Sequence, residues 1–385
     1  MAHSQRRPVV GCRRILLGVQ VSRAFRRALD FLTGGGDHSV TVPPMDGALN
    51  PNNRLEEASA IAAAEAPDNL CLFGGRLLFS NGGDVLEIDL ASPGTPPKPR
   101  AAFGAAVTSL AARDDALAVA LADGQILIRG GPRDGLALTS AGGSALNCVT
   151  AMAFADADTL LFCIGSEKHP LERWKHDLME LGSSGSAWRI DLGTKTAVPL
   201  ARGLAFPFGV AALADGGALV VESWRHRVLR IAPGDTAPLP VLWDLPAYPA
   251  RLAAAADGSG GWLALFAPRR QLTEFILREP SYRKRMMAEI APNYWVGPTL
   301  APMRSFLEPL QGGTLKKLAA IKPWAPSRSY GLVVRLDAEC QPVSSFHSRA
   351  DGSRHGVMSA VEVDGRLIAA SRGSSTVVAV DLEGG

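Results

Sequence analysis

Several signatures of common enzyme classes are missing from this sequence. It has no GxSxG nucleophile elbow, no glycine-rich phosphate loop and no HExxH pair, so it gives no support for serine-hydrolase, nucleotide-dependent or zinc-peptidase chemistry. No apolar run approaches the ~20 residues that a membrane-spanning helix needs. The chain is 47% hydrophobic and 20% charged, which is typical of a globular protein with a substantial core.

The charge balance and the cysteine content indicate which binding partners and which cellular compartment to expect. Forty basic residues against 37 acidic ones leave a formal net charge of +3, which is too balanced to indicate a nucleic-acid partner. The five cysteines are odd in number and include no CxxC pair. Because free buried thiols are typical of a reducing compartment, we expect a cytoplasmic protein.

Basic residues are concentrated at the N-terminus, where seven arginines lie within the first thirty positions. Residues 1–36 are predicted to form a basic amphipathic helix that ends at three consecutive glycines. Two roles stay open for this helix. It packs on the outside of the remaining fold, or residues 13–32 make a peripheral contact with an anionic membrane surface.

A repeated pattern begins near Asn69: an apolar strand, a tight turn, a second apolar strand, a polar gap and a third strand. The turns are marked by Gly74-Gly75, Asp114-Asp115, Asp156-Ala157, Asp215-Gly216, Asp257-Gly258 and Asp364-Gly365, at successive spacings of 40, 42, 59, 42 and 107 residues. A period near 40 residues is typical of one four-stranded propeller blade. The sequence therefore predicts an all-β fold, a six-bladed β-propeller over residues 37–385. Seven blades are the alternative if the N-terminal region contributes strands.

The two long intervals between turns contain insertions. The first, Glu167 to Gly185, carries charged and small residues, and the second, about 268–329, is mostly helical in pattern. The helical insertion either packs on the propeller as core or forms a lid over the central channel or a membrane-touching patch.

Several segments resemble the strictosidine-synthase-like family, which is related to the gluconolactonase and paraoxonase propellers. The most specific is Gly203–Ile231, in which a GL-F-P stretch is followed by a GV strand, a DGG turn and a VES strand; APDNL at Ala66–Leu70 adds to it. The resemblance covers roughly residues 42–382. It implies hydrolysis of small lactones or esters with a calcium ion in the channel, held by a glutamate and by asparagine or aspartate oxygens of the innermost strands.

The positions that correspond to these metal ligands are largely altered. The first glutamate corresponds to Asp68, and Asn147 fits an asparagine that opens the third blade. The remaining positions read Phe208, Ala250 and Arg251, so two oxygen-bearing positions are lost and a guanidinium is gained. Since a guanidinium repels a nearby cation in a poorly solvated channel, the replacements argue against the Ca²⁺ that the resemblance implies.

The plant enzymes of this family that condense an amine with an aldehyde use a glutamate just before the last hairpin. That place falls at Met358 here, and Glu362 lies further along the strand. Methionine cannot transfer a proton, so the condensation reaction is disfavoured.

The channel candidates share a predicted position on or near the innermost strands. They are Asp68, Asn69, Asn147, Phe208, Glu222, Arg251 and Ser359, with Asp68 and Asn147 as the remaining metal ligands. We expect Glu222 to pair with Arg251 or Arg225, and His226 or His355 could serve as a base.

Two functions stay open for these residues. One is a hydrolase of small lactones or esters, as the resemblance implies. The other is a non-catalytic propeller that binds a small anionic ligand or a protein partner. In the second case the candidates either contact the ligand or are polar groups that satisfy one another inside a narrow channel.

Overall fold

The computed structural model describes residues 42–234, 237–302, 305, 307–309, 316–317, 320–321 and 328–382. The helix predicted over residues 1–36, and with it the membrane contact of residues 13–32, lies outside these residues.

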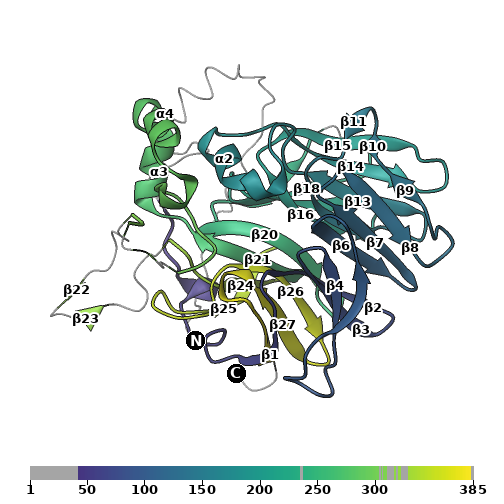
Figure 1. Ribbon diagram of the computed structural model, residues 1–385, viewed down its shortest axis with the longest axis horizontal. Coiled ribbons are helices and arrows are strands. Elements are labelled where there is room, and N and C mark those ends of the chain that lie inside the picture. The colour runs from purple at the N-terminus through teal and green to yellow at the C-terminus, as the bar shows by residue number, and fades with distance from the viewer. Residues whose placement is uncertain are drawn as a thin grey trace, which may run out of the picture. The chain divides into compact units, whose positions relative to one another are not determined.

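Six four-stranded antiparallel sheets make up the fold (Figure 1). The first strands of the sheets in the order of the ring are β2 (Pro67–Phe73), β6 (Val107–Arg113), β12 (Val149–Phe154), β16 (Pro207–Ala212), β20 (Ala247–Ala254) and β26 (Val357–Val363). Each of these strands contacts the next, and β26 contacts β2. They therefore form a closed ring of innermost strands, and the predicted six-bladed propeller is confirmed.

The outer strands follow in chain order within each blade. Blade one continues with β3 (Arg76–Asn81), β4 (Asp84–Ile88) and β5 (Lys98–Ala102), blade two with β7 (Ala116–Leu121), β8 (Gln125–Arg129) and β9 (Ala137–Leu138), and blade three with β13 (Thr159–Ile164), β14 (Gly185–Asp191) and β15 (Ala197–Leu204). Blade four adds β17 (Ala218–Glu222), β18 (Arg227–Ile231) and β19 (Leu239–Leu242), and blade five adds β21 (Gly261–Pro268), β24 (Leu332–Leu336) and β25 (Pro342–His347). Two short hairpins, β10–β11 (Ser140–Ala141 and Ser144–Ala145) and β22–β23 (Lys316–Lys317 and Ala320–Ile321), lie outside the blades.

The sixth blade is completed by a strand from the other end of the chain. β27 (Arg366–Ser371) and β28 (Thr376–Asp381) follow β26, and β1 (Ser59–Ala63) pairs with β28 as the outermost strand. The described residues before the repeats, from position 42 on, thus add one strand to an existing blade and form no seventh blade. This pairing removes the free edge that an open ring of sheets would leave.

The six predicted turn dipeptides all join the first strand of a blade to the second. Positive φ angles occur at several of them, among them 54° at Gly74, 51° at Asp114 and 70° at Gly365. Glycine and aspartate tolerate this left-handed region better than most residues, which is why such dipeptides mark hairpins.

Helices gather on one side of the propeller, above the N-terminal ends of β16 and β20 (Figure 1). The first insertion forms η2 (Leu171–Arg173) and α2 (Trp174–Met179), and the second forms α3 (Gln271–Arg278), α4 (Pro280–Glu289) and η3 (Pro292–Tyr294). A further 3-10 turn, η1 (Gly47–Leu49), precedes β1, and η4 (Arg372–Ser374) joins β27 to β28. No helix in the described part of the chain is long and apolar enough to cross a membrane.

Candidate functional site in the central channel

A β-bulge recurs at the same level in all six innermost strands. In each first hairpin the pairing of the two strands skips at least one residue near the start of the inner strand. The skipped residues are Asn69 and Leu70 in β2, Thr108 in β6, Thr150 in β12, Phe208 in β16, Ala250 and Arg251 in β20, and Met358 in β26. Since a bulge frees backbone groups from the ladder, this level of the channel offers carbonyl oxygens to a donor.

Arg251 uses those acceptors. Its Nε and Nη2 donate to the two carboxylate oxygens of Asp68 at 2.9 and 3.0 Å, a bidentate ion pair. Nη2 also donates to the carbonyl oxygen of Thr108 at 3.0 Å, and Nη1 donates to that of Thr150. The guanidinium carbon lies 5.2 Å from the centroid of the Phe208 ring. One side chain from blade five thereby contacts blades one to four.

Asp68 is the anion that this cation neutralises. The residue is only 3% exposed. Burial is the largest single influence and raises the pKa of its carboxyl group, but Arg251, Arg372 and the backbone N–H of Asn69 together outweigh burial, and the net pKa is lowered. Arg372 adds a second cation, with Nη1 3.8 Å from Oδ2. Asp68 therefore stays ionised and is fully engaged as an acceptor.

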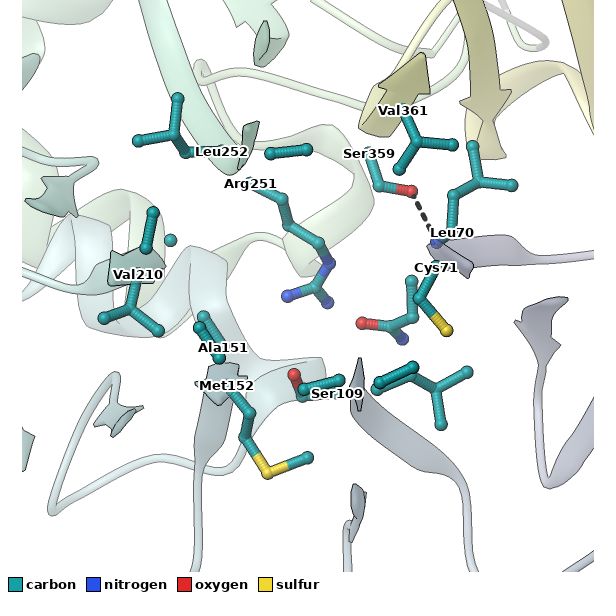
Figure 2. Close-up of a pocket in the computed structure, with 18 of the residues that line it drawn as sticks. Leu70, Cys71, Ser109, Ala151, Met152, Val210, Arg251, Leu252, Ser359 and Val361 are labelled. Carbon is teal, nitrogen blue, oxygen red and sulfur yellow. Dashed lines mark hydrogen bonds between the residues drawn. The ribbon is translucent and has the colours of Figure 1, made fainter. Parts of the chain in front are cut away.

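Asn69 and Ser359 complete the polar level of the channel. Asn69 has a φ of 56°, and its Nδ2 donates to the Ser80 hydroxyl at 2.8 Å, whereas its Oδ1 is buried with no hydrogen-bond partner. The Ser359 hydroxyl accepts the backbone N–H of Leu70 at 3.1 Å, the dashed line in Figure 2. This bond links blade six to blade one, where the ring closes.

A cavity of about 310 Å³ begins at this level and follows the channel toward the C-terminal ends of the innermost strands. Its polar lining consists of Asn69, Ser109, Arg251 and Ser359, and its other walls are mostly apolar, among them Leu70, Leu110, Met152, Val210, Leu252 and Val361. Figure 2 shows the guanidinium of Arg251 reaching into the middle of these side chains. Side chains become half-exposed toward the strand ends, so the cavity opens to solvent there.

Arg251 is the sole charged residue that lines this cavity. Cys71 also lines it, but burial raises the pKa of its thiol to about 12, so the sulfur is protonated near neutral pH. The cavity thus presents one cation, three neutral polar side chains and an apolar wall.

The opposite end of the channel is filled by side chains. Phe208, Tyr248 and Met358 are at most 4% exposed and belong to one apolar cluster with residues of α2, α3 and α4. Aromatic contacts continue the cluster, with the Phe206 and Trp224 rings stacked at 4.5 Å. The described helices therefore act as core that covers this end.

Two predicted channel residues lie elsewhere. Asn147 is exposed on the turn before β12 and does not line the cavity. Glu222, fully buried at the end of β17, accepts from the Ala205 N–H at 2.6 Å and pairs with Arg225 at 2.5 Å and Arg227 at 2.6 Å. Of the two partners expected for Glu222, Arg225 is therefore present, and Arg251 is bound to Asp68 instead.

The two candidate histidines are also away from the cavity. His226 is buried with its Nε2 3.5 Å from Glu274, and burial is the first cause of its lowered pKa. His355 is held between the Ser329 hydroxyl at 2.7 Å and the carbonyl oxygen of Arg349 at 2.7 Å. Neither imidazole lines the channel, so neither is placed to act on a molecule bound there.

The residues at the bulge level do not fit a calcium ion. Calcium takes six to eight oxygen ligands, usually including more than one carboxylate. Here the one carboxylate is Asp68, and both of its oxygens bind Arg251. Among the residues described, no cluster of three or more His, Cys, Asp or Glu could hold a metal ion. Arg251 supplies the positive charge that a metal would supply.

Sequence reasoning missed Thr108 and Thr150, whose carbonyl oxygens bind Arg251. A simple count from the turns would have found them. Asp68, Thr108, Thr150, Arg251 and Met358 each stand six residues before the first residue of their turn dipeptide, and Phe208 stands seven before. Asn147 stands nine before its turn, which places it outside the channel level.

Comparison with known proteins supports the fold. No protein-family model matches the sequence, and no curated protein matches it either. A solved structure provisionally assigned as a gluconolactonase is similar with a TM-score of 0.51 and 12% identity, over 84% of this chain and 91% of that one. A calcium-binding regucalcin from Agrobacterium tumefaciens gives 0.48 and 11%, over 84% and 93%. The likeness to the first of these structures, at 12% identity, shows the fold alone.

Proposed function

We propose that this chain is a metal-independent binding propeller whose channel cavity takes a small ligand with an apolar body and an anionic or acceptor head group. The observation that carries the proposal is the position of Arg251, which occupies the centre of the channel in a bidentate pair with Asp68. Asp68 already occupies the fork of Arg251, so an anionic group would be attracted by the positive charge that Arg251 and Arg372 together leave beside the single carboxylate. A cavity near 310 Å³ lies at the lower end of the range for small-molecule sites.

The charges around the cavity support an anionic or acceptor head group. Arg251 lines the cavity, and Arg372 lies 3.8 Å from Asp68, so two guanidinium groups face one carboxylate. Asn69 lines the same cavity, and its buried, unpartnered Oδ1 is an acceptor for a donor of the head group. A hydroxy acid, with its carboxylate toward Arg251 and its hydroxyl toward Asn69, combines both features.

A hydrolase of small lactones or esters is the second candidate. It rests on the family resemblance and on the fold shared with the provisionally assigned gluconolactonase. The cavity lining argues against it, because it contains no carboxylate or histidine that could serve as a base. The hydroxyl of Ser359 accepts the N–H of Leu70, and the thiol of Cys71 stays protonated.

Titration calorimetry with 2-hydroxyhexanoate, and with neutral hexanol as the comparison, tests the proposal. We expect the acid to bind in the presence of a chelator and the alcohol to bind at least tenfold more weakly. Ala254, exposed at the cavity lining, gives a blocking variant, Ala254→Trp, and Leu239, 62% exposed and outside the lining, gives the control Leu239→Trp. The blocking variant should lose binding and the control should keep it.

The same preparations separate the two functions when they are assayed with simple lactones and aryl esters. No turnover with or without calcium is expected. Hydrolysis that requires calcium and is abolished by a chelator would show that the protein is a hydrolase, against the proposed binding function. Equal affinity for the acid and the alcohol, or unchanged binding by Ala254→Trp, would show that the cavity is not the binding site for an anionic ligand.

A further inference from the structure

A second polar site lies outside the channel, where the chain leaves β21 and enters α3. Arg270 stands just before α3 and is only 4% exposed. Both terminal nitrogens of its guanidinium are buried and have no hydrogen-bond partner. An arginine has five N–H donors, and burying its charge without an acceptor costs several kcal/mol. The fold retains this arginine in a place where it is destabilising by itself.

The one charge that acts detectably on Arg270 is another cation, which adds to the cost of its burial. Arg328, 1% exposed, carries the charge that, after burial, lowers the pKa of Arg270. Burial, followed by the same charge of Arg328, lowers the pKa of Lys175 in α2 to about 8. The charge of Arg328, in the chain before β24, thus acts both on Arg270 at the β21–α3 junction and on Lys175 in α2.

The turn at residues 292–297 binds two of these cations through its carbonyl oxygens. The carbonyl oxygens of Asn293, Trp295 and Gly297 accept from Arg328 at 3.2–3.3 Å, and that of Pro292 accepts from the Lys175 ammonium at 3.3 Å. Carbonyl oxygens satisfy donors but bring no negative charge. The cluster is therefore built by the fold and is still positively charged.

Among the described residues, one carboxylate forms an ion pair with any of these three cations. Glu308 pairs with Arg328 at 2.8 Å. It is also the one acidic residue in the sequence between positions 290 and 336, so the rest of the insertion after α4 has no second carboxylate to offer. An anion from outside the insertion would neutralise Arg270 and relieve the repulsion.

We propose that Arg270, together with Lys175 and Arg328, forms a binding site for a small oxyanion, a phosphate or carboxylate group, beneath the helical insertion. The fork of Arg270 supplies two adjacent N–H donors that match two oxygens of such a group. Lys175 and Arg328 add charge without changing the geometry of the fork. None of the three residues lines the channel cavity, so the site is independent of the function proposed above.

Thermal unfolding of the full chain with inorganic phosphate, sulfate or acetate tests the site, with sodium chloride at equal ionic strength as reference. We expect a saturable rise in Tm with phosphate beyond that with chloride, since a ligand of the folded state raises stability. A larger response to acetate than to phosphate would assign the site to carboxylates. Equal Tm in all four salts would overturn the proposal.

Arg270→Met and the control Arg285→Met, which changes a 77% exposed arginine paired with Glu289, locate the effect. In chloride Arg270→Met should have an equal or higher Tm than the wild-type protein, because an unpaired buried charge is removed. Its phosphate affinity should fall about tenfold to a hundredfold, as for loss of a charged hydrogen bond, while Arg285→Met binds normally. Unchanged phosphate affinity in Arg270→Met would refute the assignment. Should that variant fail to fold, Lys175→Met, which removes an outlying cation, must also weaken phosphate binding.

Discussion

Replacing Arg251 with methionine leaves Asp68, 3% exposed, as a buried carboxylate without its bidentate partner. Breaking a buried ion pair in this way typically costs about 3–5 kcal/mol. The freed carbonyl oxygens of Thr108 and Thr150 add to the loss, whereas Arg372 compensates weakly because it is 39% exposed and 3.8 Å away. We therefore expect Arg251→Met to lower the free energy of unfolding by about 4 kcal/mol.

A double-mutant cycle with Asp68→Asn separates the ion pair from ordinary packing. If the two charges depend on each other, the double variant should be less destabilised than the sum of the singles by at least about 2 kcal/mol. Urea unfolding gives the free energy of unfolding of each variant, provided that the dependence on urea concentration (the m-value) is the same for all of them. Arg285→Met is the control, because its exposed pair with Glu289 should contribute at most about 0.5 kcal/mol. A loss below about 1 kcal/mol for Arg251→Met, or simple additivity in the cycle, would refute the reasoning.

Three further outcomes follow from the same structure. Burial lowers the pKa of His347 to about 4. The neutral imidazole therefore contributes fully to the free energy of unfolding above pH 6.5, and this contribution falls by up to about 3 kcal/mol as the pH drops from 6.5 to 4. In urea unfolding, His347→Gln should lose this pH dependence of the free energy of unfolding. Phe208→Asn combined with Arg251→Asp should create a calcium site, seen as a Tm that rises with calcium and returns with a chelator; a folded variant indifferent to calcium would contradict this. Cys71 should resist thiol reagents in the native protein at pH 8 and react only on unfolding, and rapid native labelling would be inconsistent with its pKa of about 12.

The blade architecture was predictable because it depends on local chemistry that repeats. Each turn dipeptide, such as Asp215-Gly216, favours a hairpin on its own, and six copies at blade spacing fix the number of blades. The closing strand β1 was not predictable, because Ser59–Ala63 is a short, mostly small-residue segment whose pairing with β28 is decided by the ring. Tertiary context overrides strand propensity in such cases.

The channel was predictable only in part. Asp68 and Arg251 were found because both depart from a family pattern, but their mutual pairing needed the register. Asn147 was chosen because it fits an asparagine of the family pattern, whereas the strand register places Thr150 at the bulge level. Backbone acceptors also leave no trace in side-chain identity, so the carbonyl oxygen of Thr108 could not be assigned a role from the sequence.

A crystal structure of the wild-type protein grown with excess calcium tests most directly whether Arg251, and not a metal ion, occupies the channel at the level of the bulges. We expect electron density for the Arg251 guanidinium against both oxygens of Asp68, with no anomalous peak between the six bulges. A calcium ion within about 2.3–2.6 Å of the Asp68 carboxylate, with Arg251 turned away, would contradict it.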